Sequence, residues 1–185
     1  MKHLLSVILI AVVMQSCLTT RVSSTETKAN EAIIFGRIII DGDNPQISCK
    51  NVQLNFFSED GSPVLAITDG DGYFYTKSPL GKLYFEGFHY NKGLKAYTVI
   101  NNDMLNADIS NGDEVFYVGD IKAEWTISDI FQTNKLKLEF KTPKPLRETL
   151  PNTPCSASIE NESITFFMNK FTENKKKIRI SLLKE

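Results

Sequence analysis

Few side chains in this sequence could carry chemistry. The chain has two histidines, His3 and His89, and His3 lies in an N-terminal leader that we expect to be removed. A single remaining histidine cannot form a Ser-His-Asp triad or a histidine-based metal site. We therefore expect His89 to be a packed or exposed strand residue, and we expect a protein that is not an enzyme.

Two acidic loops offer oxygen ligands for calcium, residues 41–44 (DGDN) and residues 69–72 (DGDG). Neither has the spaced acidic positions and the distal glutamate of a calcium-binding loop. Glycine and aspartate also favour tight turns without any metal. Asp69 and Asp71 could also be considered as a catalytic carboxylate pair, but their place in a tight turn explains both residues more simply. We expect no metal, no catalytic residue and no cofactor.

The first sixteen residues are typical of a signal peptide. Lys2 gives a positive start, and residues 4–13 form an apolar run that is too short to span a bilayer. Ser16 then directly precedes Cys17. This arrangement resembles the lipobox of bacterial lipoproteins, which implies cleavage before Cys17 and a lipid on that cysteine. The alternative is a plain secretory signal with an incidental cysteine.

The rest of the chain contains no other long apolar stretch, so lipid would be its only membrane attachment. Leu18 after the lipid site is not an acidic retention signal of the kind known in some bacteria, which favours the outer membrane of the cell envelope. Residues 17–31 are rich in Ser, Thr and Asn and predict a flexible tether, with a recognition peptide as the alternative. The net charge of −1 gives no electrostatic case for nucleic acid.

The folded part is organised around residues 64–85. Short apolar runs there alternate with Asp-Gly and Pro-x-Gly sequences, which indicate a hairpin turn and a second turn. With 42% hydrophobic and 23% charged residues, a packed core is expected and global disorder is not. The structural turn residues are Asp69, Gly70, Asp71 and Gly72 in the first turn, and Pro79 and Gly81 in the second.

Short strands at regular spacing predict an all-β sandwich. Residues 32–41 are apolar on both faces, which indicates a strand covered on both sides or a twisted strand. Leu105 and Ile109 in the polar loop 102–113 are expected to tuck under the sandwich. The expected strands are residues 32–41, 51–57, 64–68, 73–78, 82–90, 94–101, 114–121, 135–141, 163–168 and 177–183.

Four sequences occur in an order that resembles the carboxypeptidase regulatory-like domain. They are residues 36–38 (GRI), 51–54 (NVQL), 68–74 (TDGDGYF) and 79–84 (PLGKLY). The resemblance covers residues 36–100 and implies an antiparallel Greek-key, transthyretin-like sandwich. It also implies an accessory or binding module without catalytic residues, because that family has none to carry over.

We therefore expect a sandwich domain over residues 32–141. Residues 142–185 are expected to be a proline-rich linker followed by a C-terminal β-hairpin extension, since proline cannot continue a central strand or a helix interior. Cys49 and Cys155 are the cysteines left after Cys17 is lipidated. In an exported protein they could form a disulfide, and the alternative is two separate buried thiols.

Two function classes follow from these expectations. The first is a non-catalytic, membrane-anchored module that contacts an envelope protein. The second is a sugar- or peptide-binding lipoprotein with an exposed aromatic face. The basic residues are expected to discourage edge-to-edge strand pairing, with a polyanion or membrane-surface role as the alternative. The aromatic residues are Tyr73, Tyr75, Tyr84, Phe88 and Tyr90, and the basic residues are Lys135, Lys137, Lys141, Lys175, Lys176 and Lys177.

Overall fold

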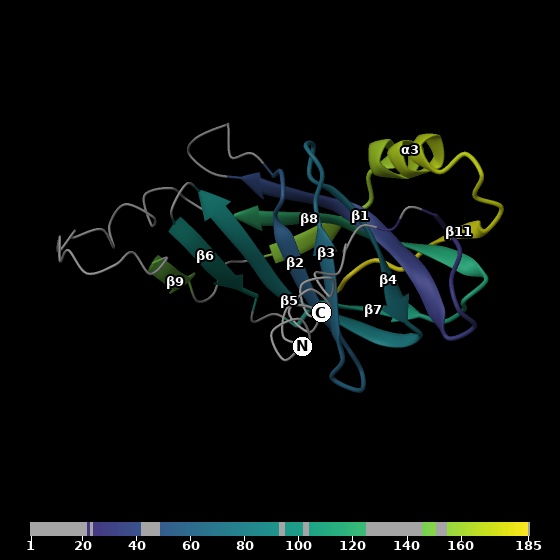
Figure 1. Ribbon diagram of the computed structural model, residues 1–185, viewed down its shortest axis with the longest axis horizontal. Coiled ribbons are helices and arrows are strands. Elements are labelled where there is room, and N and C mark those ends of the chain that lie inside the picture. The colour runs from purple at the N-terminus through teal and green to yellow at the C-terminus, as the bar shows by residue number, and fades with distance from the viewer. Residues whose placement is uncertain are drawn as a thin grey trace, which may run out of the picture.

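The computed structural model describes residues 22, 24–41, 49–92, 95–101, 104–124, 146–150 and 155–184. These residues form a mostly β structure with one helix (Figure 1). The elements are β1 (Glu31–Asp41), β2 (Gln53–Ser58), β3 (Pro63–Ile67), β4 (Tyr73–Pro79), β5 (Gly81–Lys92), β6 (Lys95–Ile100), β7 (Asn106–Ile109), β8 (Glu114–Glu124), β9 (Leu146–Leu150), β10 (Cys155–Ser158), α3 (Asn161–Lys170) and β11 (Lys177–Ile180).

The strands form two sheets. In sheet A the order is β10-β8-β1-β4, and β11 also pairs with β8. In sheet B the order is β3-β2-β5-β6-β9, and β7 also pairs with β5. Apolar residues from both sheets make one core between them, so the predicted packing of two sheets is confirmed.

The central strand β1 is buried on both of its faces. Ile34 and Ile38 belong to the core between the sheets. Ile33 and Phe35 point the other way, into a second apolar cluster on the outer face of sheet A. The first of the two sequence interpretations, a strand covered on both sides, is confirmed. Alternating side chains can bury both faces only when something covers the outer face as well.

The strand directions differ from the antiparallel prediction. β1 pairs with β8 in parallel, as do β11 with β8 and β6 with β9. The turn at residues 69–72 does not close a hairpin either, because β3 pairs with β2 in sheet B while β4 pairs with β1 in sheet A. Asp-Gly here carries the chain from one sheet to the other. A turn sequence fixes the reversal of the chain and leaves open which strands will pair.

The C-terminal part contains a helix where a strand and a hairpin were predicted. Residues 163–168 lie in α3, whose buried Ser163 and Phe167 are followed one turn later by the buried Phe171. This spacing of four residues puts all three side chains on one helix face. Glu162 in the first turn and Lys170 in the last turn also suit the helix dipole.

The other described elements of the C-terminal part, β9, β10 and β11, belong to the two sheets. β10 and β11 both pair with β8, one beside each half of that strand. After β11 the chain joins the sheets at one side: Leu183 N donates to Val118 O (3.0 Å), while Lys184 and Asn106 exchange backbone hydrogen bonds. The expected strand 135–141 lies outside the described residues. The described residues contain no helix with the length and apolar character that a membrane span requires.

Candidate functional site

Helix α3 covers the outer face of sheet A through a second apolar cluster (Figure 1). Phe167 stacks on Phe35 of β1, with ring centroids 4.1 Å apart and planes at 19°. Phe171 contacts Phe167 at 4.9 Å and meets Tyr75 of β4 edge-on at 5.1 Å. The helix is thus fixed by aromatic rings on both β1 and β4.

A buried polar network lies beneath the N-terminal end of the helix. The Tyr117 hydroxyl donates to Asp120 Oδ1 at 2.7 Å, and the Ser163 hydroxyl donates to Asp120 Oδ2 at 2.9 Å. The Glu160 backbone N–H donates to the Tyr117 hydroxyl at 3.0 Å. Asp120 is only 1% exposed. Both carboxylate oxygens have partners inside the protein, so the network joins β8 to α3.

Burial is the largest influence on the pKa values of Asp120 and Tyr117 in this network. It raises the pKa of the Asp120 carboxyl above its ordinary value, although hydrogen bonds from Ser163 and Tyr117 and the charge of Arg37 act in the opposite direction. Burial also raises the pKa of the Tyr117 hydroxyl well above its ordinary range. Tyr117 is therefore a hydrogen-bond donor at any physiological pH. Asp120 is a carboxylate for which ionisation is costly.

A second group of contacts joins the turn at residues 69–72 to the helix. The Arg37 guanidinium lies 4.8 Å from the ring centroid of Tyr73, and its Nε donates to Asp71 O at 3.0 Å. Arg37 also forms an ion pair with Glu162 at 3.5 Å. The Tyr73 ring stacks on Phe166, with centroids 3.8 Å apart. Burial raises the pKa of Tyr73 more than the Arg37 charge lowers it.

An apolar groove of about 490 Å³ runs between α3 and β11. Met168 and Ile180 on its walls are 57% and 50% exposed. Lys175 is exposed in the segment that joins α3 to β11, between Asn174 and Lys176 on the groove wall. Lys170 lies on the other side of the helix, with its ammonium 5.1 Å from the Tyr75 ring centroid. We call this surface the α3–β11 face and define it by Ile164, Met168, Ile178, Ile180 and Lys175.

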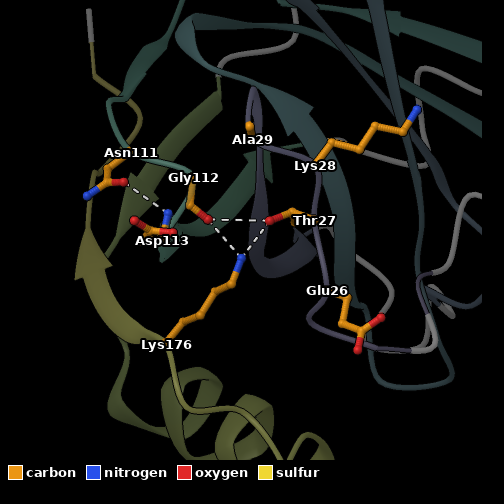
Figure 2. A pocket seen from close by; sticks show the side chains of 8 residues that line it. All are labelled: Glu26, Thr27, Lys28, Ala29, Asn111, Gly112, Asp113 and Lys176. Atoms are coloured by element: carbon orange, nitrogen blue, oxygen red, sulfur yellow. Dashed lines mark hydrogen bonds between the residues drawn. The ribbon is translucent and has the colours of Figure 1, made fainter.

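The N-terminal segment is attached to the sandwich beside this face (Figure 2). Lys176 Nζ donates to the Gly112 carbonyl at 2.8 Å and to the Thr27 hydroxyl at 2.5 Å, and Thr27 donates to the same carbonyl at 3.3 Å. These residues line a shallow cavity of about 540 Å³. Thr25 is buried, and Val22 packs against the second apolar cluster. Within residues 17–31, predicted as a flexible tether, the structure thus attaches Val22, Thr25 and Thr27 to the domain.

The predicted turn residues lie where the chain passes between the sheets. Asp69 Oδ1 accepts from the backbone N–H groups of Asp71 (3.1 Å) and Tyr73 (3.0 Å). Gly72 has a φ of +87°, and a Cβ there would lie 2.5 Å from the Ile38 carbonyl oxygen. A Cβ on Gly70 would have nothing within 4 Å. The strict requirement for glycine in this turn thus belongs to position 72.

The second predicted turn returns the chain from sheet A to sheet B. Pro79 ends β4 and Gly81 begins β5. Gly81 has a φ of +115°, a backbone angle that residues with a Cβ rarely adopt.

The predicted cysteine residues are not brought into a common site. Cys17 lies outside the described residues, and no disulfide joins Cys49 to Cys155 in the structure. Strand β8 lies between β10, which carries Cys155, and β1, whose Ile40 backbone contacts the Cys49 thiol. Burial raises the pKa of that thiol, which lowers its reactivity. The arrangement matches the alternative of two separate thiols.

The aromatic residues singled out by the sequence are mostly buried. Tyr73, Tyr75, Phe88 and Tyr90 are each less than 10% exposed. Tyr84 is half-buried and stacks on Phe57 on the outer face of sheet B, with centroids 5.0 Å apart and planes at 13°. On the same face, His89 Nδ1 shares a hydrogen bond with the Thr98 hydroxyl at 2.8 Å. This outer face combines one stacked aromatic pair with polar side chains.

The basic residues singled out by the sequence do not share one role. Lys175 and Lys177 are exposed, whereas Lys176 fixes the N-terminal segment. Lys135, Lys137 and Lys141 lie outside the described residues. Among the residues that the structure describes, no three histidine, cysteine or acidic side chains lie together as metal ligands would.

Sequence reasoning missed the Tyr117–Asp120–Ser163 network. Strict alternation along the expected strand 114–121 would put Tyr117 and Ile121 on one face, but the register shifts opposite Phe35 and Gly36. Tyr117 therefore lies in the outer cluster and Ile121 in the inner core. The signal that could have indicated this was Gly119 followed by Asp120 within an apolar strand, because a β-bulge commonly needs a glycine.

Comparisons of the chain with models of known protein families, with curated proteins and with solved structures gave no match.

Proposed function

We propose that this protein is a bacterial lipoprotein, anchored in the outer membrane by a lipid on Cys17, whose sandwich is a non-catalytic structural or protein-interaction module. The sandwich is proposed to be of the carboxypeptidase regulatory-like, Greek-key, transthyretin-like type. This part of the proposal is supported by the sequences at residues 36–38, 51–54, 68–74 and 79–84. Its partner would be another protein of the cell envelope.

The observation that carries the proposal is the path of the N-terminal segment. Residues 24–31 lead from β1 along the domain and are held by Lys176, and Val22 packs against the second apolar cluster. A lipid on Cys17 would therefore hold the whole folded unit at the membrane through a very short connection. Such a connection suits a module that acts on partners close to the bilayer.

The intact mass of membrane-extracted protein tests the anchor. We expect a chain that begins at Cys17 and carries acyl groups, because one acyl chain binds weakly whereas several hold firmly. Cys17→Ser should leave the precursor uncut or release the protein to the soluble fraction. A mature chain without acyl groups, or one with a different N-terminus, would contradict the proposal. Photo-cross-linking from exposed sheet positions in intact envelopes then identifies the protein partner.

A second candidate function is sugar or peptide binding on the outer face of sheet B. The stacked, half-buried Phe57 and Tyr84 favour it, because aromatic rings beside polar groups suit carbohydrate and peptide ligands. Calorimetric titration with cell-wall glycopeptide fragments tests this candidate. Heat that is lost in Tyr84→Ala would support it, and no heat with either protein would exclude it for those ligands.

A further inference from the structure

The α3–β11 face presents exposed apolar side chains beside a basic stretch of the chain. Residues 170–179 hold five basic residues and one acidic residue. Lys176 is bonded to Thr27 and Gly112, and Arg179 is paired with Glu114, whereas Lys175 is exposed beside the groove. Met168 and Ile180 are at least half exposed on the same face. Apolar residues next to basic side chains are typical of surfaces that rest in the interfacial region of anionic membranes.

This face also lies where the chain leaves the domain toward the predicted lipid. Val22, Ile164 of α3 and Ile178 of β11 all pack against the second apolar cluster. In Figure 1 the N-terminal segment, coloured purple, runs beside β11 toward α3. The hydrogen bonds from Lys176 to Thr27 and Gly112 join the segment to the loop before β11. The exit point and the apolar groove therefore belong to one side of the molecule.

Chain length limits how far this side can lie from the bilayer. Five residue steps separate Cys17 from Val22. A fully extended chain spans at most about 3.6 Å per residue, so their Cα atoms lie within ~18 Å of each other. The 11 residues of β1 alone span about 33 Å, nearly twice that distance. With an acylated Cys17 in the membrane surface, the side of the domain that carries Val22 must stay next to the lipid headgroups.

We propose that the α3–β11 face rests on the surface of the anionic bilayer that holds the lipid anchor. Met168 and Ile180 enter the headgroup region, and Lys175 faces lipid phosphates. The inference rests on the proposed lipid anchor for its geometry. Its chemistry belongs to the domain alone and can be measured without the lipid. The contact fixes the orientation of the sandwich and turns sheet B away from the membrane, toward an envelope partner.

The test uses the mature chain, residues 17–185, carrying Cys17→Ser so that no acyl group contributes. Binding is measured by co-sedimentation with vesicles of phosphatidylglycerol and phosphatidylethanolamine, and with vesicles of phosphatidylcholine as the neutral comparison. We expect binding to the anionic vesicles that weakens as salt rises. Lys175→Gln should reduce the partition coefficient about fivefold, since a lysine near an anionic surface contributes on the order of 1 kcal/mol.

Met168→Asp with Ile180→Asp should reduce the partition coefficient by a similar factor. Met104→Asp is the matched control, because Met104 is 56% exposed but precedes β7 at sheet B. It should bind as the parent does. Circular dichroism confirms that each variant is folded, which exposed positions should permit.

Equal binding to anionic and neutral vesicles, or equal binding by the Met168/Ile180 and Met104 variants, would overturn the proposal. A photo-cross-link from position 168 to a protein instead of lipid would also overturn it and assign the face to a protein partner. The lipid anchor is judged separately, from the intact mass of the membrane-extracted protein. A chain without acyl groups that still binds anionic vesicles through this face would refute the anchor and leave the membrane contact standing.

Discussion

Replacing Phe167 with alanine should detach α3 from sheet A. Phe167 is 1% exposed and contacts the rings of Phe35 and Phe171. Removing a buried phenylalanine side chain costs about 3–5 kcal/mol of unfolding free energy. Each aromatic pair adds about 0.5–1.5 kcal/mol beyond the area that it buries, which favours the upper half of that range. Domains of this size are stable by roughly 5–15 kcal/mol, so the loss would be a large fraction of the total.

Urea unfolding of Phe167→Ala and Met168→Ala measures the effect. Met168 is the neighbouring residue on the same helix and is 57% exposed, so its substitution should cost about 0.5 kcal/mol or less. Hydrogen exchange of the amides in residues 161–170 distinguishes global destabilisation from local opening of the helix. If Phe167→Ala unfolds within about 1 kcal/mol of the parent and α3 keeps its protection, the packing argument is refuted.

Two further predictions concern a buried carboxyl and a turn. Because burial raises the pKa of Asp120, the folded protein retains a proton that the unfolded chain has lost. The contribution of Asp120 to the free energy of unfolding should therefore be fully present below about pH 4 and be lost as the pH rises through the folded-state pKa. In urea unfolding between pH 4 and 8, Asp120→Asn should show a smaller decrease of the midpoint with pH than the parent. An unchanged pH dependence in the variant would contradict this prediction. Gly72→Val should destabilise by about 1–3 kcal/mol, because φ is +87° and the new Cβ meets the Ile38 carbonyl. Gly70→Val serves as its control in thermal melting, and equal shifts for the two variants would show that the turn argument fails.

Most strands that have one buried face and one solvent-exposed face were predicted correctly from the sequence. In β2, Leu54 and Phe56 lie in the core as their alternation predicted. Leu105 and Ile109 are buried as expected, although the loop between them contains the short strand β7. Side-chain period fixes which face a residue takes, and it carries no information about whether a neighbouring strand runs parallel or antiparallel. The parallel pairing of β1 with β8 could therefore not be predicted.

The helix escaped prediction because its composition favours a strand. Four of the six residues 163–168 (SITFFM) are β-branched or aromatic, and no side chain caps the helix at Glu160. The burial of Ile33 and Phe35 under the helix stabilises the fold by more than this local preference for a strand disfavours it. The attachment by Lys176 was equally invisible, since one lysine in a run of three gives no sign of being partly buried. Both features depend on contacts between the two ends of the chain.

Those contacts determine the order in which the fold can be completed. Thr27 and Lys176 are 149 residues apart in sequence, yet a hydrogen bond joins their side chains. The second apolar cluster likewise needs Phe167 and Phe171 to meet Ile33 and Phe35. Until the last part of the chain has emerged, β1 has an uncovered apolar face. Contacts of such long range slow folding, because the entropy of closing the loop must be overcome before any contact forms. A nascent or incompletely translocated chain therefore carries an exposed, aggregation-prone strand near its N-terminus, and only the arrival of α3 removes that hazard.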